Sequence, residues 1–541
     1  MSFEVRERDI LARIGKLKTK SGKVETPLLF PVVNPAVQPI PPKKIEEVFG
    51  CEALITNAYI LKKRFGEKPV ETGIHKFLDF NRAVMTDSGA YQILVYGDVE
   101  ITPKEIVRYQ EQIDTDIATI LDLPTGWNVS RRQAEKTVKE TIRRAKELFK
   151  LKTRDDVLWV GPIQGGVHLD LVAKSAVEMS KLPFQIHALG SPTEVMKHYR
   201  FDVLVDMIMT AKMNLPLERP FHLFGAGHPF MFALAIALGC DLFDSAAYAI
   251  YAREKRYMTE YGTSKLDDLD YFPCSCPKCV KMTPKEVLEL PQNERQAFLA
   301  EHNLYVCITE LKRIKKAIKE GRLWEHLEIR AHGHPALLQA VKKLKKYEEF
   351  IERHSPLTKK KGIFFFNSLG LLRPEVVRYR KRMIYRYTPP MGVENLMLIP
   401  QTKTKPFHKS KIFKEIMKVL KRETENFMDK FHICFYVAPF GVIPTELDEV
   451  YPLSQYEITV PPDEETRDYV ARQVIEYINR TNYKRVIFIH DEENWGAKVF
   501  NACKKACLKK EISFSHLKLE DEIKELLERL KEVLRKNVTK S

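Results

Sequence analysis

The sequence predicts an α/β protein: a (β/α)8 TIM barrel with an inserted cysteine-rich segment, followed by a smaller α/β C-terminal domain. Short apolar runs alternate with helical stretches from residue 28 to about residue 335, and such alternation is typical of a parallel sheet. About eight such units over roughly 300 residues favour a closed barrel over an open doubly wound sheet. The chain has 541 residues, too many for one core, so we expect two or three domains.

The expected strands are apolar runs that end in Gly, Pro, Asp or Ser. Helical stretches such as TPKEIVRYQEQID and SRRQAEKTVKETIRRAKELFK lie between several of them. Polar residues gather just after the runs, at the strand ends where barrel enzymes build their active sites. In chain order, the runs are LLFPVV, ALITNAYIL, RAVMTD, ATILDLP, VLWVGPIQG, FQIHALG, FHLFGAGHP and CDLFDSAA.

Composition and charge narrow the class of protein. The hydrophobic content of 44% is enough for packed domains, and the formal net charge of +16 favours a polyanionic partner such as nucleic acid. A lysine-rich surface on a heat-adapted protein would give the same balance. No apolar run is long enough to cross a membrane, and the charged N-terminus is unlike a secretory signal. We therefore expect a cytoplasmic protein with no membrane partner.

Three of the nine cysteines are concentrated in one short segment. An odd count, scattered elsewhere, is unlike a disulfide framework. Zinc takes four tetrahedral thiolate and imidazole ligands, and a fully occupied sphere leaves no position for a catalytic water. The alternative is a group of unpaired surface thiols. We expect a zinc-binding insertion at residues 272–305, with one structural zinc held by the C-x-C-x2-C motif and a later histidine, namely Cys274, Cys276, Cys279 and His302.

Three aspartates follow apolar runs: Asp87, Asp122 and Asp244. At the strand ends of one barrel they would converge on a single pocket, although spacing alone cannot show that they meet, and each could instead cap a helix. Two carboxylates that flank a sugar carbon can break a glycosidic bond. The polar and glycine residues nearby suit a flat heterocycle: Ser88, Tyr91, Gln164, Gly165 and Gly166.

Several long motifs carry a resemblance to a known family. They are DSGAYQILVYGDVEITPKEI, TILDLPT, HLFGAGHP, DLFDSAAYAIYAREKRYMT and LDYFPCSCPKC. In this order, over about residues 1–345, they resemble the archaeal tRNA-guanine transglycosylase family. The resemblance implies an enzyme that exchanges guanine at position 15 of tRNA for 7-cyano-7-deazaguanine (preQ0), a step toward archaeosine. It implies tRNA, guanine and preQ0 as partners, and a zinc ion but no organic cofactor.

The resemblance also implies roles for individual residues. Asp87 and Asp244 would be the catalytic pair, with Asp244 as the covalent nucleophile and Asp87 as the general acid and base. Asp122 would accept hydrogen bonds from N1–H and the 2-amino group of the base. An aromatic ring would stack on the base at Tyr91, and its O6 edge would be addressed by Gln164 and Gly166.

One loop departs from the family pattern. The segment HALGSPTEVMKHYRF has Gly190, Ser191, Pro192 and Thr193 where the family more often has glycine and small apolar residues lining the base pocket. We include Gly190 and Ser191 among the expected substrate-binding residues. The fine specificity of the pocket is therefore less well defined by the resemblance than the chemistry is.

The domain boundaries follow from composition. We expect the catalytic barrel at 1–345, a basic helical linker at 346–410, and an α/β accessory domain at 411–541. The last third resembles the accessory domain of archaeosine synthase, notably in APFGVIPTELDEVYPLSQYEI, but the synthase cysteine, tyrosine and histidine are replaced in IPQTKTKPFHKSKIF. Lysines of that segment could contact phosphates, or could belong to an exposed linker. No PUA domain is recognisable.

Two other functions stay open at this point. The first is an archaeosine synthase-like enzyme that acts on tRNA already carrying preQ0. The second is a non-catalytic, tRNA-binding subunit. Retention of Asp87, Asp122 and Asp244 argues against both. A homodimer, common in this family, and a separate PUA-containing partner protein are both compatible with the resemblance.

Overall fold

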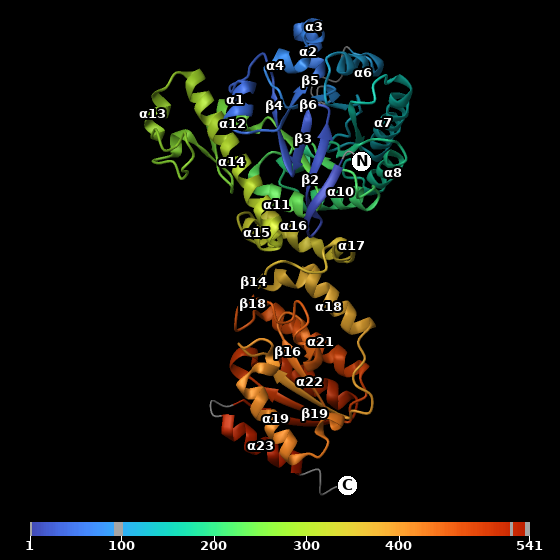
Figure 1. Cartoon of the computed structure of the whole chain (residues 1–541), viewed down its shortest axis with the longest axis vertical. Helices are drawn as coiled ribbons and strands as arrows, with labels where there is room; N and C mark the ends of the chain where they lie inside the picture. The colour runs from blue at the N-terminus through green and yellow to red at the C-terminus, as the bar shows by residue number, and fades with distance from the viewer. Residues whose placement is uncertain (1–2, 91–100, 520–522, 536–541) are drawn as a thin grey trace. The chain divides into compact units, whose positions relative to one another are not determined.

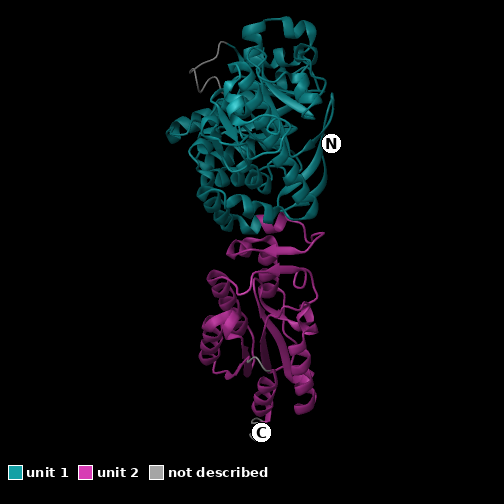
Figure 2. Ribbon diagram, turned by 90° about the vertical axis from the view of Figure 1, so that its left-hand side faces the viewer, with its two compact units in different colours: residues 1–350 teal, residues 351–541 magenta. Residues whose placement is uncertain are grey.

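The computed structural model describes residues 3–90, 101–519 and 523–535. The chain divides into two compact units, residues 1–350 and 351–541 (Figure 2). Among the described residues, no helix has the length and apolarity required to cross a membrane.

Unit 1 contains a closed barrel of eight parallel strands, as the sequence predicts (Figure 1). Each of the eight apolar runs contributes a barrel strand. The ring closes because β11 pairs with β10 on one side and with β4 on the other. Around the ring from β4, the strands are β4 (Leu28–Val33), β5 (Ala53–Asn57), β6 (Ala83–Asp87), β7 (Ile117–Thr119), β8 (Leu158–Ile163), β9 (Ile186–Leu189), β10 (Phe221–Leu223) and β11 (Leu242–Ser245).

A three-stranded antiparallel sheet precedes the barrel and was not anticipated from the sequence. It consists of β1 (Phe3–Asp9), β2 (Ala12–Thr19) and β3 (Gly22–Thr26). The buried Arg13 of β2 donates two hydrogen bonds of 2.7 Å to Asp241, which directly precedes β11. Asp241 also accepts from the backbone N–H of Phe221. This buried, bidentate pair joins the sheet to the N-terminal ends of β10 and β11.

The helices of unit 1 begin at local sequence signals. Helix α6 (Pro103–Gln112) starts with a capping box between Thr102 and Glu105, and α7 (Arg131–Leu151) is capped by Ser130. The other helices that follow the barrel strands are α1 (Pro42–Glu47), α2 (Ala58–Phe65), α3 (Lys68–Thr72), α4 (Ile74–Leu78), α8 (Leu169–Ser180), α9 (Thr193–Lys197), α10 (Phe201–Met213), α11 (Pro229–Ala237) and α12 (Ala247–Arg253).

The cysteine-rich insertion follows α12. It contains a short hairpin of β12 (Arg256–Met258) and β13 (Thr263–Lys265), then α13 (Pro284–Glu289) and the long helix α14 (Gln292–Glu320). Helix α14 packs along α12 and along α11 of the barrel. Two more helices, α15 (Leu323–Ala331) and α16 (Pro335–Lys343), return to the barrel against α11 and α10.

Unit 2 is built on a five-stranded sheet of order β17-β16-β15-β19-β20. Its central strand, β15 (Asn395–Pro400), lies within the 346–410 segment that we expected to be a linker. The flanking proline and lysine residues suggested a linker, but NLMLIP is an apolar run, and its residues from Leu396 to Pro400 are buried between β16 and β19. The other strands are β16 (Phe431–Val437), β17 (Gly441–Pro444), β19 (Arg485–His490) and β20 (Ser513–Lys518).

Helices cover this sheet. The amphipathic last helix, α23 (Ile523–Arg535), buries Leu526, Leu530 and Leu534 and packs on α19 (Lys411–Glu423). Strands β14 (Ile363–Phe365) and β18 (Tyr456–Ile458) pair in parallel and form a separate two-stranded sheet. The remaining helices are α17 (Glu348–His354), α18 (Pro374–Tyr385), α20 (Phe427–Lys430), α21 (Glu464–Arg480) and α22 (Glu492–Lys509).

Candidate active site

The three predicted aspartates converge at one mouth of the barrel. Asp87 is the last residue of β6, Asp122 follows β7, and Asp244 lies near the end of β11. Because all eight strands run parallel, these carboxyl ends share one face. Burial, followed by the negative charges of Asp122 and Asp244, raises the pKa of Asp87 to about 7. The three carboxyl groups are therefore close enough to influence one another.

Asp87 is held by a residue that the sequence analysis did not identify. The Nδ2–H of Asn57, at the end of β5, donates a hydrogen bond of 2.7 Å to Asp87 Oδ2. Asn57 and Asp87 lie opposite each other in the β5–β6 register. In the sequence, Asn57 could have been noticed as a polar residue directly after the apolar run ALIT. Its partner Asp87 could be assigned only from the strand pairing.

Asp244 has different surroundings. One of its oxygens accepts a hydrogen bond of 2.9 Å from His222 Nε2 and one of 3.0 Å from the backbone N–H of Gly225. His222 is fully buried, and its Nδ1 has no hydrogen-bond partner within the described part of the chain. The carboxylate can only accept, so the imidazole proton lies on Nε2. Two donors thus converge on one oxygen of Asp244, and about 15% of its side chain is exposed.

Asp122 is hydrogen-bonded to Gln164 at the barrel mouth. Gln164 Nε2 donates to Asp122 Oδ2 at 2.5 Å, and Gln164 Oε1 accepts from the Thr125 backbone N–H and the Ser191 hydroxyl. This network fixes the orientation of the Gln164 amide. Burial raises the pKa of Asp122 to about 6, although the bond from Gln164 acts in the opposite direction.

Gly190 is required by this network. A Cβ atom at Gly190 would lie 2.2 Å from Gln164 Nε2 and 3.0 Å from the carbonyl oxygen of Ile163. The close approach of the backbone to a side-chain amide therefore excludes any larger residue. Ser191, the neighbour that departs from the family pattern, has a positive φ of 59° and donates to Gln164. The departure thus contributes a hydrogen bond to the floor of the pocket.

The remaining predicted pocket residues differ in what they contact. The hydroxyl of Ser88 is buried and donates to the Ile120 carbonyl at 2.8 Å, so it ties β6 to the end of β7. Gly165 donates its backbone N–H to Thr125 Oγ1 at 3.1 Å, and Gly166 has a positive φ of 57°. Tyr91 lies outside the described residues.

The cysteine cluster forms a group that fits a metal ion. The ligand atoms of Cys274, Cys276, Cys279 and His302 all lie within 4.8 Å of one another. The loop between β13 and α13 carries the thiols, and α14 carries the histidine. His302 Nε2 donates to the Met258 carbonyl at 2.8 Å, which leaves Nδ1 facing the thiols. Three thiolates and one oriented imidazole are a donor set suited to a closed tetrahedral site.

Comparison with known families agrees with this division of the chain. The family model described as queuine tRNA-ribosyltransferase matches residues 9–336. A second model, described as a domain of unknown function (DUF5591), matches residues 376–534. The first match covers the barrel and the cysteine cluster, and the second falls within unit 2.

Curated relatives are similar over most of the chain. A protein of Pyrobaculum aerophilum is 45% identical over 462 residues, covering 84% of this chain and 90% of its own length. One from Saccharolobus solfataricus is 43% identical over 503 residues (91% of this chain, 97% of the relative). One from Methanocaldococcus jannaschii is 44% identical over 474 residues (85% and 68%). All three are named tRNA-guanine(15) transglycosylase.

Proposed function

The chain belongs to the queuine tRNA-ribosyltransferase family, and from this premise we propose that it replaces guanine at position 15 of tRNA with 7-cyano-7-deazaguanine. The observation that carries the proposal is the unlike environment of two carboxyl groups at one mouth. Asp87 is partly buried, and desolvation with the negative charges of Asp122 and Asp244 raises its pKa to about 7, whereas one oxygen of Asp244 accepts hydrogen bonds from His222 and from the backbone N–H of Gly225. Such a difference separates an acid from a nucleophile.

The steps follow from these two environments. Asp244 attacks C1′ of the nucleotide, and the bond between C1′ and guanine N9 breaks while Asp87 gives its proton to the departing base. The ribose is then esterified to Asp244. The incoming base loses its N9 proton to Asp87 and attacks C1′, which releases Asp244. Protons and bonds balance over the cycle, so the exchange requires no external energy source.

Asp122 and the floor around Gln164 are suited to hold the base. A carboxylate accepts hydrogen bonds from N1–H and the 2-amino group, the donor edge shared by guanine and 7-cyano-7-deazaguanine. The amide nitrogen of Gln164 already donates to Asp122, and its amide oxygen already accepts from Thr125 and Ser191. The role of Gln164 is therefore to orient Asp122, while the backbone N–H of Gly166 addresses the O6 edge, since that of Gly165 already donates to Thr125.

We propose that the cysteine cluster holds a zinc ion with a structural role. The thiols come from an irregular loop, and the ion would crosslink that loop to helix α14. Cys276, Cys279 and His302 lie within 3.5 Å of one another through their ligand atoms. No proton transfer or base contact is assigned to this site.

An exchange assay tests the proposal. The protein is incubated with tRNA carrying guanine at position 15 and with radiolabelled guanine, and label in the tRNA is counted. Incorporation is expected with the natural chain and should be absent with Asp244→Asn, which keeps the shape but removes the nucleophile. Asp267→Asn, at an exposed carboxylate outside the barrel mouth, is the matched control.

The alternatives predict other outcomes. A non-catalytic subunit would bind tRNA but give no incorporation with any variant. A synthase-like enzyme would leave guanine tRNA unlabelled and alter only tRNA that already carries 7-cyano-7-deazaguanine. Incorporation that survives in Asp244→Asn would disprove the assignment of this residue.

A further inference from the structure

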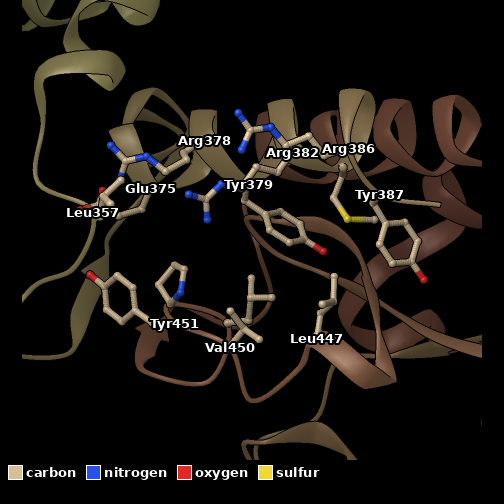
Figure 3. Close-up of a pocket in the computed structure, with 13 residues that line it drawn as sticks. Leu357, Glu375, Arg378, Tyr379, Arg382, Arg386, Tyr387, Leu447, Val450 and Tyr451 are labelled. Carbon is tan, nitrogen blue, oxygen red and sulfur yellow. The ribbon is translucent and has the colours of Figure 1, made fainter. Parts of the chain in front are cut away.

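Unit 2 has a cavity of about 260 Å³ beside helix α18 (Figure 3). The arginines of one wall, Arg378, Arg382 and Arg386, are spaced four residues apart, so they share one face of the helix and its C-terminal end. The opposite wall comes from the segment that follows β17 and includes Leu447 and Val450. A basic wall therefore faces an apolar one.

Two of the four charged side chains that line this cavity, Arg378 and Glu375, are already paired. Arg378 donates to Glu352 Oε1 at 2.8 Å and to the Ser355 carbonyl at 3.0 Å. The Glu375 carboxylate lies 3.1 Å from Lys359 Nζ and 3.4 Å from Arg373 Nε. These contacts cancel the charges within the wall, so Glu375 does not repel an anion that enters the cavity.

Arg382 and Arg386 differ from Arg378. Both are exposed, and neither guanidinium has an ion pair or a side-chain hydrogen bond within residues 3–90, 101–519 and 523–535. Two unpaired guanidinium groups one helical turn apart are suited to bind the oxygens of a phosphate.

Two tyrosines of the cavity, Tyr379 and Tyr387, offer their rings rather than their hydroxyl groups. Tyr379 Oη donates to the Val442 carbonyl at 2.7 Å, and Tyr387 Oη donates to Glu446 at 2.5 Å. Their polar ends are therefore satisfied by the protein. Across the cavity, Val450 is 50% exposed. Aromatic and aliphatic surfaces that stay accessible in this way are suited to stack or pack against a flat base.

We propose that this cavity binds one unstacked nucleotide of tRNA, with its phosphate on Arg382 and Arg386 and its base between Tyr387 and Val450. The identification of the RNA as tRNA rests on the proposed function. The proposal that the cavity binds a nucleotide rests on its side chains alone. A cavity of this size admits a single nucleotide and excludes a base-paired helix. Single-stranded segments, whose bases can be splayed out, are the fitting part of an RNA.

Binding of a short RNA to the full chain tests the proposal. A labelled single-stranded ribotetranucleotide is titrated with protein and followed by fluorescence anisotropy. The double variant Arg382→Gln, Arg386→Gln should bind at least tenfold more weakly. Loss of two phosphate contacts should lower the slope of log affinity against log salt by about 1.4. The control Arg472→Gln, Lys505→Gln removes two exposed charges from α21 and α22 of the same unit and should change affinity less than twofold.

A second variant addresses the apolar wall. Val450→Asp puts a negative charge opposite the arginines at a half-exposed position that tolerates it, and it should weaken binding as much as the arginine variant does. Adenosine monophosphate should compete for the site better than inorganic phosphate at equal concentration. Equal losses in the control variant, equal binding of duplex RNA, or equal competition by phosphate would overturn the proposal.

The exchange assay separates this proposal from the proposed function. In the arginine variant, the KM for tRNA should rise while kcat is unchanged, because the barrel mouth is untouched. If the natural chain exchanged no guanine yet the tetranucleotide still depended on Arg382 and Arg386, the proposed function would fail and the nucleotide site would stand. If exchange proceeded with an unchanged KM in the variant, the nucleotide site would fail alone.

Discussion

The barrel mouth of unit 1 and the arginine-lined cavity of unit 2 use charge in opposite ways. At the mouth, Asp122 is buried, Asp87 is partly buried, and both carboxyl groups have raised pKa values. In unit 2, Arg382 and Arg386 are exposed and unpaired within the described residues. Burial changes the protonation of a carboxyl group, whereas an exposed guanidinium keeps its charge at every relevant pH.

Groups that transfer protons and groups that only bind a ligand require different environments in a protein. A proton donor at neutral pH requires a desolvated acid, and desolvation is supplied by a closed barrel. A contact to a phosphate requires only a persistent charge, which an exposed helix face supplies.

The largest expected effect is on Asp87. Asp87→Asn retains the size of the side chain but cannot transfer a proton, so single-turnover exchange should slow by about 10²- to 10⁴-fold. Rapid-quench counting of labelled tRNA measures it. The Asn57→Ala variant, which removes the hydrogen bond to Asp87 and the side-chain cap of helix α2, should lose far less; an equal loss would show that the position of Asp87 rather than proton transfer matters.

The raised pKa of Asp87 also predicts a pH-dependent stability. The unfolded chain ionises this group above its ordinary value near 3.8, whereas the folded chain keeps the proton to about 7. The folded state therefore binds more protons between these limits, and its stability falls as pH rises through that window. By the usual conversion the loss is on the order of 4 kcal/mol above pH 7. Urea unfolding of the natural chain and Asp87→Asn should diverge from pH 4 to 7; parallel curves would refute the burial argument.

Metal removal should act through stability. Cys279→Ser removes one thiolate, and the thermal midpoint should fall by about 5–10 °C, with loss of the bound zinc measured by elemental analysis. Cys307→Ser changes a buried thiol outside the cluster and is the matched control. It should retain one zinc per chain. Loss of zinc from both variants would contradict the assignment of the ligands.

A smaller effect is expected at the pocket floor. Gly190→Ala forces Gln164 away from Asp122, since the new Cβ would overlap the Gln164 amide. Exchange kcat/KM for guanine should drop about ten- to hundredfold. Gly262→Ala is the control, because a Cβ there meets nothing within 4 Å. An unchanged kcat/KM in the first variant would mean that Gln164 does not set the base contact.

The smallest effect is the part of the salt dependence of tRNA binding that Arg382 and Arg386 contribute. From 50 to 200 mM salt, two phosphate contacts contribute about a sevenfold rise in KM for tRNA. That part of the rise should vanish in Arg382→Gln, Arg386→Gln. The pH midpoint assigned to Asp87 should stay fixed over the same range, because buried groups are screened much less than exposed ones. A midpoint that moves with salt would place Asp87 in contact with solvent.

The sequence allowed much of the barrel to be predicted, because each strand is a local apolar run with a breaker after it. It also indicated the metal cluster, since three of its ligands lie in one short motif. It did not predict the role of 395–400, where lysine and proline residues flank a buried strand. Nor did it identify His222 or Asn57, whose partners are set by strand pairing.

By itself, then, the sequence determined the alternation of strands and helices, the family and the identities of the acidic residues. Only the tertiary structure decided which acid has a raised pKa and which groups donate to each acid. It also decided that, among the described residues, two arginines lie unpaired beside an apolar wall. The physical reason is that hydrophobic periodicity acts between near neighbours, whereas desolvation and charge pairing depend on residues brought together from distant parts of the chain.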